Sequence, residues 1–346
     1  MDKTSFNFSP ESSQEILLRN SKLSLTYDPE KNFDNWRVEV SRKLRELLGM
    51  DLFKKVRPNL RIEYSELRES FKETRFVFTS EENVDVPCHL LVPLKGKAPF
   101  PLVICLQGHS TGMHISLGRP KYDGDEESIK GDRDFALQAV KEGYAALVME
   151  QRCFGERSDS RPKERKSLNS TCQHASMVDV LLGRTMIGAR VWDVSRAIDI
   201  MKDFPDVDTN RIGCMGNSGG GSVTYYAACL DPRIMIAMPS CCFCTYEDSI
   251  GKIDHCADNY IPGILKYLEM ADLSCLVPAR MLVIVAGRTD NIFPIAGVKK
   301  AFEKVQVIYA KAGVPERCVL VEGDSGHRFY AKEAWPVFRR LSGWDK

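Results

Sequence analysis

Residues 216–220 read Gly-Asn-Ser-Gly-Gly and place a serine, Ser218, inside a G-x-S-x-G motif. A short apolar run at 212–215 precedes the motif, and a helical pattern of small residues at 222–230 follows it. A serine at the apex of a sharp turn between a strand and a helix is the context of a nucleophile elbow. The turn needs glycines because its backbone is strained and the strand and helix come close together. We therefore predict that Ser218 is a nucleophile for acyl transfer.

Two further residues complete a candidate relay with this serine. Asp290 follows an apolar run at 281–286, and His327 follows the last predicted strand, at 318–321. A hydroxyl needs a general base, and the base needs an acid that orients it. The chain order Ser218, Asp290, His327 is the order expected for α/β-hydrolases, and all three residues fall on loops after strands. The sequence thus predicts a catalytic triad of Ser218, Asp290 and His327.

Asp290 and His327 each have a second interpretation that involves no catalysis. Asp290 could be the N-cap of a helix that begins near Phe293. His327 could be a loop histidine bonded to backbone groups. Of the six histidines, however, only His327 follows the appropriate strand. The motif in its expected context favours the triad.

An oxyanion needs N–H donors close to the nucleophile. We expect the backbone N–H of Gly219 to be one donor and a group in the loop 107–112 to supply the other. That loop follows the predicted strand 102–106, and its His109 N–H is the preferred candidate. The His109 imidazole could point into the pocket or serve only in packing. Nothing in the sequence identifies the residues that bind the rest of the substrate.

The composition excludes several classes of protein. The 346 residues are 43% hydrophobic and 27% charged, with a net charge of +1, so bulk electrostatics favour neither nucleic acid nor a membrane surface as a partner. The N-terminus lacks the apolar core of a secretory signal, and no apolar run reaches the length of a membrane span. The 12 cysteines are scattered. With no export signal, they indicate reduced thiols and a cytoplasmic location.

The spacing of apolar residues predicts a three-layer α/β fold with a mostly parallel sheet. Two strands at 74–79 and 84–92 suggest an antiparallel N-terminal edge, and Pro87 suits an edge strand better than a central one. The remaining strands are short, nearly continuous apolar runs, as expected for strands buried on both faces. These runs lie at 102–106, 145–149, 212–215, 234–238, 281–286 and 318–321.

The chain divides into an N-terminal arm with a helical extension, residues 1–70, and a catalytic domain, residues 71–346. Trp36, Val40, Leu44, Leu47 and Leu48 share one face of a helix in the extension, and a longer helix covers 187–201. Three stretches interrupt the alternation of strand and helix after strand ends, where open α/β sheets bind ligands. These loop insertions lie near 109–130, 154–172 and 241–273, and we expect them to line the pocket.

No cofactor is expected, because the first parallel strand is not followed by G-x-G-x-x-G and no Walker motif is present. Metal is also not expected: Cys241, Cys242, Cys244, His255 and Cys256 form a cysteine–histidine cluster, but their spacing is irregular for zinc.

Two structural interpretations concern the loop after strand 145–149 and the long helix. We expect Arg152 to pair with an acid that holds its loop. Trp192 should pack in the core, and Asp193 should form a buried pair with an arginine.

Five motifs occur in order along the chain: LQGH at 106–109, QRCFG at 151–155, GARVWD at 188–193, DTNRIG at 208–213, and Asp290 followed by Phe293-Pro294. With these motifs, the chain from about residue 84 onward resembles α/β-hydrolases of the branch that holds acetyl xylan esterases and dienelactone-hydrolase-like serine esterases. The resemblance implies a serine carboxylesterase acting on short acyl esters, acetyl esters first, of small molecules or acetylated carbohydrates. The apex serine differs from the cysteine of dienelactone hydrolases proper.

Three other functions stay open. A prolyl-oligopeptidase-like peptidase would use the same triad, although about 70 residues before the first strand are too few for a propeller. A lactone or C–C hydrolase would also share the site. A non-catalytic binding protein on a hydrolase scaffold would have lost a triad member. The N-terminal helix with Trp36 either serves a homo-oligomer or packs on its own domain.

Overall fold

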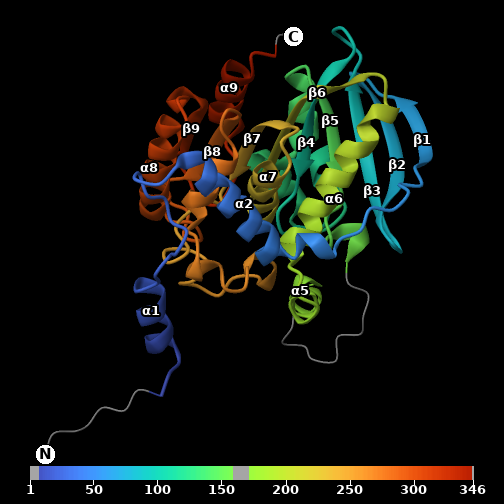
Figure 1. Cartoon of the computed structure of the whole chain (residues 1–346). Helices are drawn as coiled ribbons and strands as arrows, with labels where there is room; N and C mark the ends of the chain where they lie inside the picture. The colour runs from blue at the N-terminus through green and yellow to red at the C-terminus, as the bar shows by residue number, and fades with distance from the viewer. Residues whose placement is uncertain (1–7, 159–170, 345–346) are drawn as a thin grey trace, which may run out of the picture.

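The computed structural model describes residues 8–158 and 171–344 (Figure 1). Most of the predicted insertion at 154–172, and the first seven residues of the N-terminal arm, lie outside the described residues. Among the helices that are described, none combines the length and the apolar character that crossing a bilayer requires.

A nine-stranded sheet runs through the described part of the chain, in the order β1-β2-β3-β5-β4-β6-β7-β8-β9. β4 to β9 are parallel to one another, whereas β1, β2 and β3 form an antiparallel edge that joins β5. The predicted α/β-hydrolase architecture is therefore confirmed. The strands are β1 (Arg61–Leu67), β2 (Phe71–Glu81), β3 (Val84–Pro93), β4 (Phe100–Leu106), β5 (Ala145–Met149), β6 (Val207–Asn217), β7 (Ile234–Ser240), β8 (Met281–Gly287) and β9 (Cys318–Gly323).

Helices cover both faces of the sheet and complete three layers (Figure 1). α2 (Phe33–Leu48), α6 (Met186–Ile200), α7 (Gly219–Leu230) and α8 (Ile295–Lys311) contribute to one hydrophobic cluster, and α4 (Phe135–Lys141) and α9 (Ala331–Ser342) to the other. Shorter or peripheral helices are α1 (Glu11–Arg19), α3 (Asp125–Ser128) and α5 (Thr171–Leu181).

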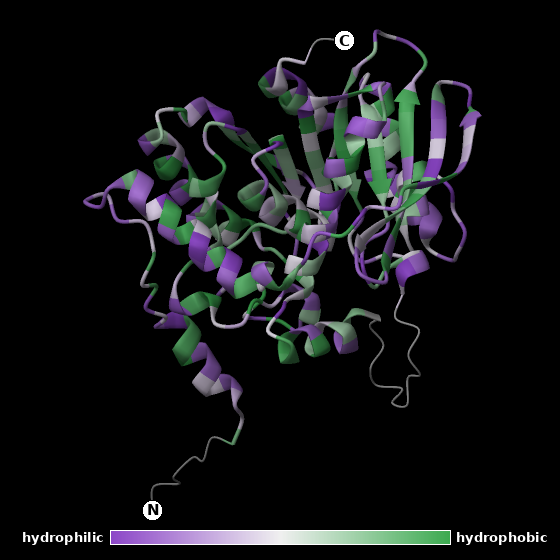
Figure 2. Cartoon of the chain, turned by 45° about the vertical axis from the view of Figure 1, so that its right-hand side comes forward, coloured by the Kyte–Doolittle hydropathy of each residue, from purple (hydrophilic) through white to green (hydrophobic). Residues whose placement is uncertain are grey.

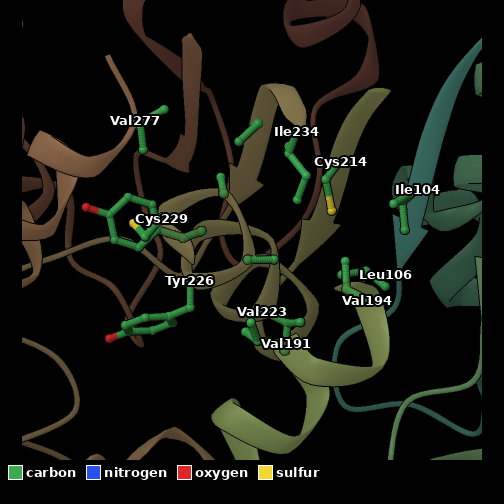
Figure 3. Close-up of a cluster of buried hydrophobic side chains, with 14 of the residues drawn as sticks. Ile104, Leu106, Val191, Val194, Cys214, Val223, Tyr226, Cys229, Ile234 and Val277 are labelled. Atoms are coloured by element: carbon green, nitrogen blue, oxygen red, sulfur yellow. The ribbon is translucent and has the colours of Figure 1, made fainter. Parts of the chain in front are cut away.

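The two clusters follow from the alternation of side chains along buried strands. In β4, Ile104 and Leu106 point into the first cluster, and Val103 and Cys105 into the second. Figure 3 shows part of the first cluster, to which Ile104 and Leu106 from β4 and Val194 from α6 belong. In Figure 2 the central strands are coloured mainly as hydrophobic, whereas the outer helices alternate between hydrophobic and hydrophilic residues. The continuous apolar runs of the sequence are thus explained by burial on both faces.

The helix α2, which carries Trp36, packs on its own domain, and its role in a homo-oligomer stays a prediction. The Asn32 side chain caps its first turn, and Gly49 ends it in the left-handed conformation. Its buried face includes Trp36, whose indole N–H donates to the carbonyl of Leu25 at 2.8 Å. α1 lies outside the α/β body and has no buried residue (Figure 1). The division of the chain at residue 70 stays a prediction.

The edge position expected for β3 is wrong. β3 pairs with β2 on one side and with β5 on the other, and the edge strand is β1, which the sequence did not reveal. Pro87 is tolerated because the β3–β5 pairing begins one residue later, at Cys88. The Pro87 carbonyl still accepts from the Glu150 N–H at 3.0 Å. The proline therefore removes a donor just where no partner strand needs one.

Candidate active site

Ser218 occupies the turn between the end of β6 and the first residue of α7. Its φ of 56° and ψ of −124° are unusual for a residue with a side chain, as a nucleophile elbow requires. A Cβ on Gly216 would lie 2.5 Å from the carbonyl oxygen of Gly220, and a Cβ on Gly220 would collide with the carbonyl of Leu106. The motif's glycines are thus explained by close approach of strand, helix and the neighbouring strand.

Asp290 and His327 are brought together from the ends of β8 and β9. His327 Nδ1 lies 2.8 Å from Asp290 Oδ2 in a hydrogen bond, and the Asp290 side chain is fully buried. The other carboxylate oxygen, Oδ1, accepts from the backbone N–H groups of Ile292 at 2.8 Å and Phe293 at 3.1 Å. The interpretation of Asp290 as a helix N-cap is wrong, because the N-cap of α8 is Pro294, which has no side-chain cap. Asp290 instead stabilises the turn before α8 and hydrogen-bonds His327.

Asp290 is kept ionised although it is buried. Burial raises the pKa of this carboxyl, but the hydrogen bond and charge of His327, together with the two backbone N–H groups, outweigh it and lower the pKa. An ionised, fixed carboxylate is what the acid of a triad needs to be.

Ser218 lies one strand away from this pair. The Ser218 N–H donates to the carbonyl of Ser240, at the end of β7, at 2.8 Å. Cys241 follows Ser240, and its sulfur lies within 4.8 Å of a carboxylate oxygen of Asp290 and a ring nitrogen of His327. Ser218 Oγ itself makes no hydrogen bond within the described residues. Contacts between a nucleophile and its base are often long in a protein without substrate. The structure thus brings Asp290 and His327 into direct contact, and places Ser218 at the end of β6, which β7 separates from β8.

Cys241 is a residue of this site that the sequence analysis assigned only to a cysteine cluster. Its thiol donates to the Arg328 carbonyl at 3.2 Å, and its φ is 48°. Burial, followed by the charge of Asp290, raises its pKa to about 12, so the thiol stays protonated at neutral pH. Cys241 is therefore no rival nucleophile. Its place as the first residue after β7 is the signal that could have revealed it.

The two expected oxyanion donors lie next to each other. Gly108 runs so close to the elbow that a Cβ there would lie 2.9 Å from Ser218 Cβ. A Cβ on Gly219 would lie 3.3 Å from the His109 ring and 4.0 Å from the His109 backbone nitrogen. Gly219 is also the first residue of α7, where helix N–H groups lack helical partners and the dipole favours negative charge.

The His109 side chain forms a second histidine–aspartate pair. Its Nε2 lies 3.1 Å from Asp258 Oδ2, and the same oxygen accepts from Arg190 Nη1 at 2.6 Å. Burial opposes protonation of His109, but Asp258 and Cys256 outweigh it and raise the pKa to about 9. The ring of Phe154 contacts both His109, at 5.1 Å between centroids, and the Arg190 guanidinium, at 4.4 Å. Asp258 was not predicted as a residue of the site, because it lies in a short 3-10 helix, Ala257–Asn259, that follows no strand directly.

The expected structural role of Arg152 is confirmed. Its Nε donates to Asp193 Oδ2 at 2.9 Å and its Nη2 to Asp193 Oδ1 at 2.8 Å, and Nη2 also reaches Glu81 Oε2 at 3.1 Å. The buried arginine pair expected for Asp193 is therefore present, with Arg157 as a second cation at 2.9 Å. Trp192 is half-buried, and its indole N–H donates to the Ser80 carbonyl at 2.9 Å.

Glu150 joins the loop after β4 to the loop after β5. Its carboxyl oxygens accept from the Met113 N–H at 3.0 and 3.1 Å and from the Glu156 N–H at 3.3 Å. Burial raises the pKa of this carboxyl to about 7, although the two backbone donors oppose the rise. The buried carboxyl of Glu150 thus fixes the loop that carries His109 through the Met113 N–H.

The cysteine–histidine cluster predicted from sequence is divided between two places. Cys241 lies with Asp290 and His327, whereas Cys256 lies with His109, Cys172 and Asp258. Cys244 instead contacts the Pro294 carbonyl at 3.8 Å.

Two comparisons with known proteins give matches over most of this chain. A model of the Abhydrolase family matches residues 14–333. YtaP of Bacillus subtilis strain 168, provisionally called a hydrolase, is 28% identical over 315 residues, which cover 89% of this chain and 99% of YtaP.

Several solved structures share the fold at low sequence identity. A Bacteroides fragilis protein provisionally assigned as an acetyl xylan esterase superposes with a TM-score of 0.76 and 18% identity, covering 100% of this chain and 92% of its own. A glucuronoyl esterase from Solibacter usitatus gives 0.65 and 14%, covering 93% and 97%. Acetyl xylan esterase 1 from Thermoanaerobacterium sp. JW/SL YS485 gives 0.59 and 15%, covering 99% and 100%.

Proposed function

Because this chain belongs to the Abhydrolase family, we propose that it is a serine carboxylesterase that hydrolyses short-chain acyl esters, acetyl esters first. The observation that carries the proposal is the hydrogen bond of 2.8 Å between His327 and a buried, ionised Asp290, close to a serine in a strained elbow. Acetylated carbohydrates are the proposed natural class of substrate, because two of the structural neighbours are named as acetyl xylan esterases.

The proposed reaction has two steps. Ser218 Oγ attacks the ester carbonyl carbon while His327 Nε2 takes the hydroxyl proton, and Asp290 stabilises the imidazolium through Nδ1. The N–H groups of Gly219 and His109 hold the oxyanion. The imidazolium then protonates the leaving alkoxide, which gives the alcohol and an acyl-enzyme. Water, deprotonated by His327, attacks the acyl-enzyme, releases the carboxylic acid and restores the Ser218 hydroxyl.

The electrostatics favour His327 over His109 as the base. With a pKa raised to about 9, His109 carries its proton at neutral pH and has no lone pair with which to accept another. Its positive charge instead lies beside the proposed oxyanion donors. This arrangement supports a division of labour in which one histidine transfers protons and the other holds its loop.

The first experiment replaces the nucleophile. Ser218→Ala should lower kcat/KM for p-nitrophenyl acetate by at least about 10⁴-fold and abolish labelling by a fluorophosphonate probe. Ser249→Ala is the control, because it also removes one serine hydroxyl, but from a fully buried side chain that donates to the Thr245 carbonyl. Turnover near the wild-type value in Ser218→Ala would refute the assignment.

A substrate series tests the acyl and alcohol parts. Acetyl, butyryl and octanoyl p-nitrophenyl esters should show a steep fall in kcat/KM beyond acetyl if the pocket is small. Acetylated xylan, methyl glucuronate, a lactone and an amide separate acetyl esterase activity from the glucuronoyl esterase, lactonase and peptidase alternatives. A flat acyl profile would indicate a general carboxylesterase, and faster amide cleavage would overturn the proposal.

A further inference from the structure

A cluster of side chains of metal-binding types lies beside the proposed oxyanion donors, and the proposed ester hydrolysis does not use these side chains. One ligand atom from each of His109, Cys172, Cys256 and Asp258 lies within 4.8 Å of all the others. They come from three segments that are far apart in the sequence: the loop after β4, the start of α5, and the 3-10 helix Ala257–Asn259 together with Cys256, its N-cap. Cys172 and Asp258 are buried, with exposed fractions of 0% and 1%. A third thiol, Cys153, contacts Cys172.

We propose that His109, Cys172, Cys256 and Asp258 form a binding site for a thiophilic divalent cation of the zinc class. Two thiolates, an imidazole and a carboxylate are the ligand types that zinc takes in tetrahedral sites. Zinc bonds of about 2.0–2.3 Å put tetrahedral ligand atoms roughly 3.3–3.8 Å apart. Atoms that already lie within 4.8 Å of one another need only small side-chain rotations to reach this geometry.

The charges of the cluster balance when a divalent cation is bound. Two thiolates and Asp258 supply three negative charges, and the fully buried Arg190 supplies one positive charge. A divalent cation therefore brings the total to zero, which a buried site requires. Arg190 also contacts two of the four ligands, Asp258 Oδ2 at 2.6 Å and Cys172 Sγ at 3.4 Å. Arg190 does not bind the cation itself but would orient Asp258 and Cys172, as hydrogen-bond partners of metal ligands commonly do.

The cluster is open to solvent on one side. The His109 side chain is 36% exposed, and Cys256 is only half-buried, so an ion can arrive from the active-site surface. Bound there, the cation would join the loop that carries His109 to two segments of the pocket wall. No sequence spacing reveals this site, because its two cysteines lie more than eighty positions apart and only Cys256 belongs to the cluster considered earlier.

The test titrates metal-stripped protein with Co²⁺ in the presence of a phosphine reductant. We expect one Co²⁺ per chain, visible absorption bands of tetrahedral Co²⁺, and a near-ultraviolet band from charge transfer between thiolate and metal. Zn²⁺ should bleach these bands. Cys256→Ser should weaken Co²⁺ binding at least about 100-fold, and Cys172→Ser should do the same. Absence of the charge-transfer band in the wild-type protein would overturn the proposal.

Two control variants locate the ion. Cys318→Ser alters a buried thiol that bonds only the Pro315 carbonyl and should keep the full spectrum. Cys241→Ser tests the second group of ligand-type atoms, which includes Asp290 and His327. If Cys241→Ser loses the charge-transfer band and Cys256→Ser keeps it, the ion binds at the proposed triad and this proposal is wrong.

The metal test stands apart from the esterase proposal. Zn²⁺ should raise the Tm of the wild-type protein and of Cys318→Ser but not that of Cys256→Ser. A cation that binds only the folded protein stabilises it, and only a protein with the intact site binds the cation. Cys256→Ser is expected to fold, since Cys256 is the less buried of the two thiols. An equal rise in all three proteins would contradict the site, whatever the activity on esters.

Discussion

Two histidine–aspartate pairs lie close to Ser218, and they differ in what else holds the aspartate. Asp290 receives two backbone N–H groups besides His327, whereas Asp258 receives the Arg190 guanidinium besides His109. Both carboxylates are buried, and both have a lowered pKa despite that burial.

The comparison shows that residue types alone do not define a base. In the metal-free protein, the second pair raises the pKa of His109 to about 9 and so fixes a cation. In the first pair, Asp290 is held by His327 and by neutral backbone N–H groups. This pair lies in the loops after β8 and β9, where an α/β-hydrolase carries its acid and base. Position in the fold and the partners of the acid therefore separate a proposed proton carrier from a loop anchor.

The largest expected effect separates the two histidines. His327→Ala should lower kcat/KM for p-nitrophenyl acetate by at least about 10⁴-fold because no other group accepts the serine proton. His109→Ala keeps its backbone N–H and loses only the loop anchor, so the loss should stay within about 10²-fold. Steady-state kinetics on both variants provide the test. Equal losses would mean that the two pairs share the proton transfer.

The next effect separates the two aspartates through stability. Asp258→Asn leaves the buried Arg190 charge without its carboxylate, and this should lower the free energy of unfolding by about 3–5 kcal/mol. Asp290→Asn keeps an acceptor oxygen for Ile292 and Phe293, so its cost should be about 1 kcal/mol. Urea denaturation measures both values. A larger loss in Asp290→Asn than in Asp258→Asn would reverse the comparison.

The two sides of the site should also respond to pH in opposite directions. The folded-state pKa of Glu150, on the His109 side, is raised from 4.5 to about 7, so its contribution is complete below pH 4.5 and is lost as pH rises through 7. The loss amounts to about 3 kcal/mol. The pKa of Asp290 is lowered, so its contribution is present above pH 3.8 and is lost only in acid.

Urea denaturation of Glu150→Gln between pH 4.5 and 8.5 tests the first half of this prediction. The variant should lose less stability than the wild-type protein over that range. Glu269, whose pKa burial also raises to about 7, serves as the matched residue, and Glu269→Gln should remove a similar share. An unchanged pH slope in Glu150→Gln would contradict the role of burial.

The smallest effect concerns the aromatic ring beside each histidine. Phe154 lies edge-on to His109 at 5.1 Å, and Phe293 stacks on His327 at 6.0 Å. Replacing either ring by leucine should cost about 1 kcal/mol of interaction. Phe293→Leu should therefore change kcat about fivefold, whereas Phe154→Leu should act mainly on thermal stability. A strong effect of Phe154→Leu on kcat would link His109 more closely to the chemistry.

Much of the fold could be predicted because burial on both faces leaves a clear trace in sequence. All six apolar runs that were expected to form parallel strands lie within β4 to β9. β1 was missed because Arg61–Leu67 is exposed on nearly every residue, so no apolar pattern distinguishes it from a loop. The helix α1 left no signal either, since none of its residues is buried.

The site was predictable only where chemistry coincides with a strand end. Ser218, Asp290, His327 and His109 each follow a strand, so topology alone limits where they lie. Asp258 and Cys172 belong to segments whose paths depend on tertiary packing rather than on local pattern. Their contact with His109 joins residues far apart in the sequence, and no rule based on sequence spacing predicts it.

The close backbone packing at Gly108, Gly216 and Gly220 has a consequence for redesign of the pocket. Backbone groups there are in direct contact, so a methyl group added at any of these glycines would displace the turn that carries Ser218. Directed-evolution libraries should therefore hold these glycines, Cys241, Cys256 and Asp258 constant and diversify the exposed positions 251–254 instead. Variation there can reshape selectivity toward new esters while the reactive centre keeps its alignment.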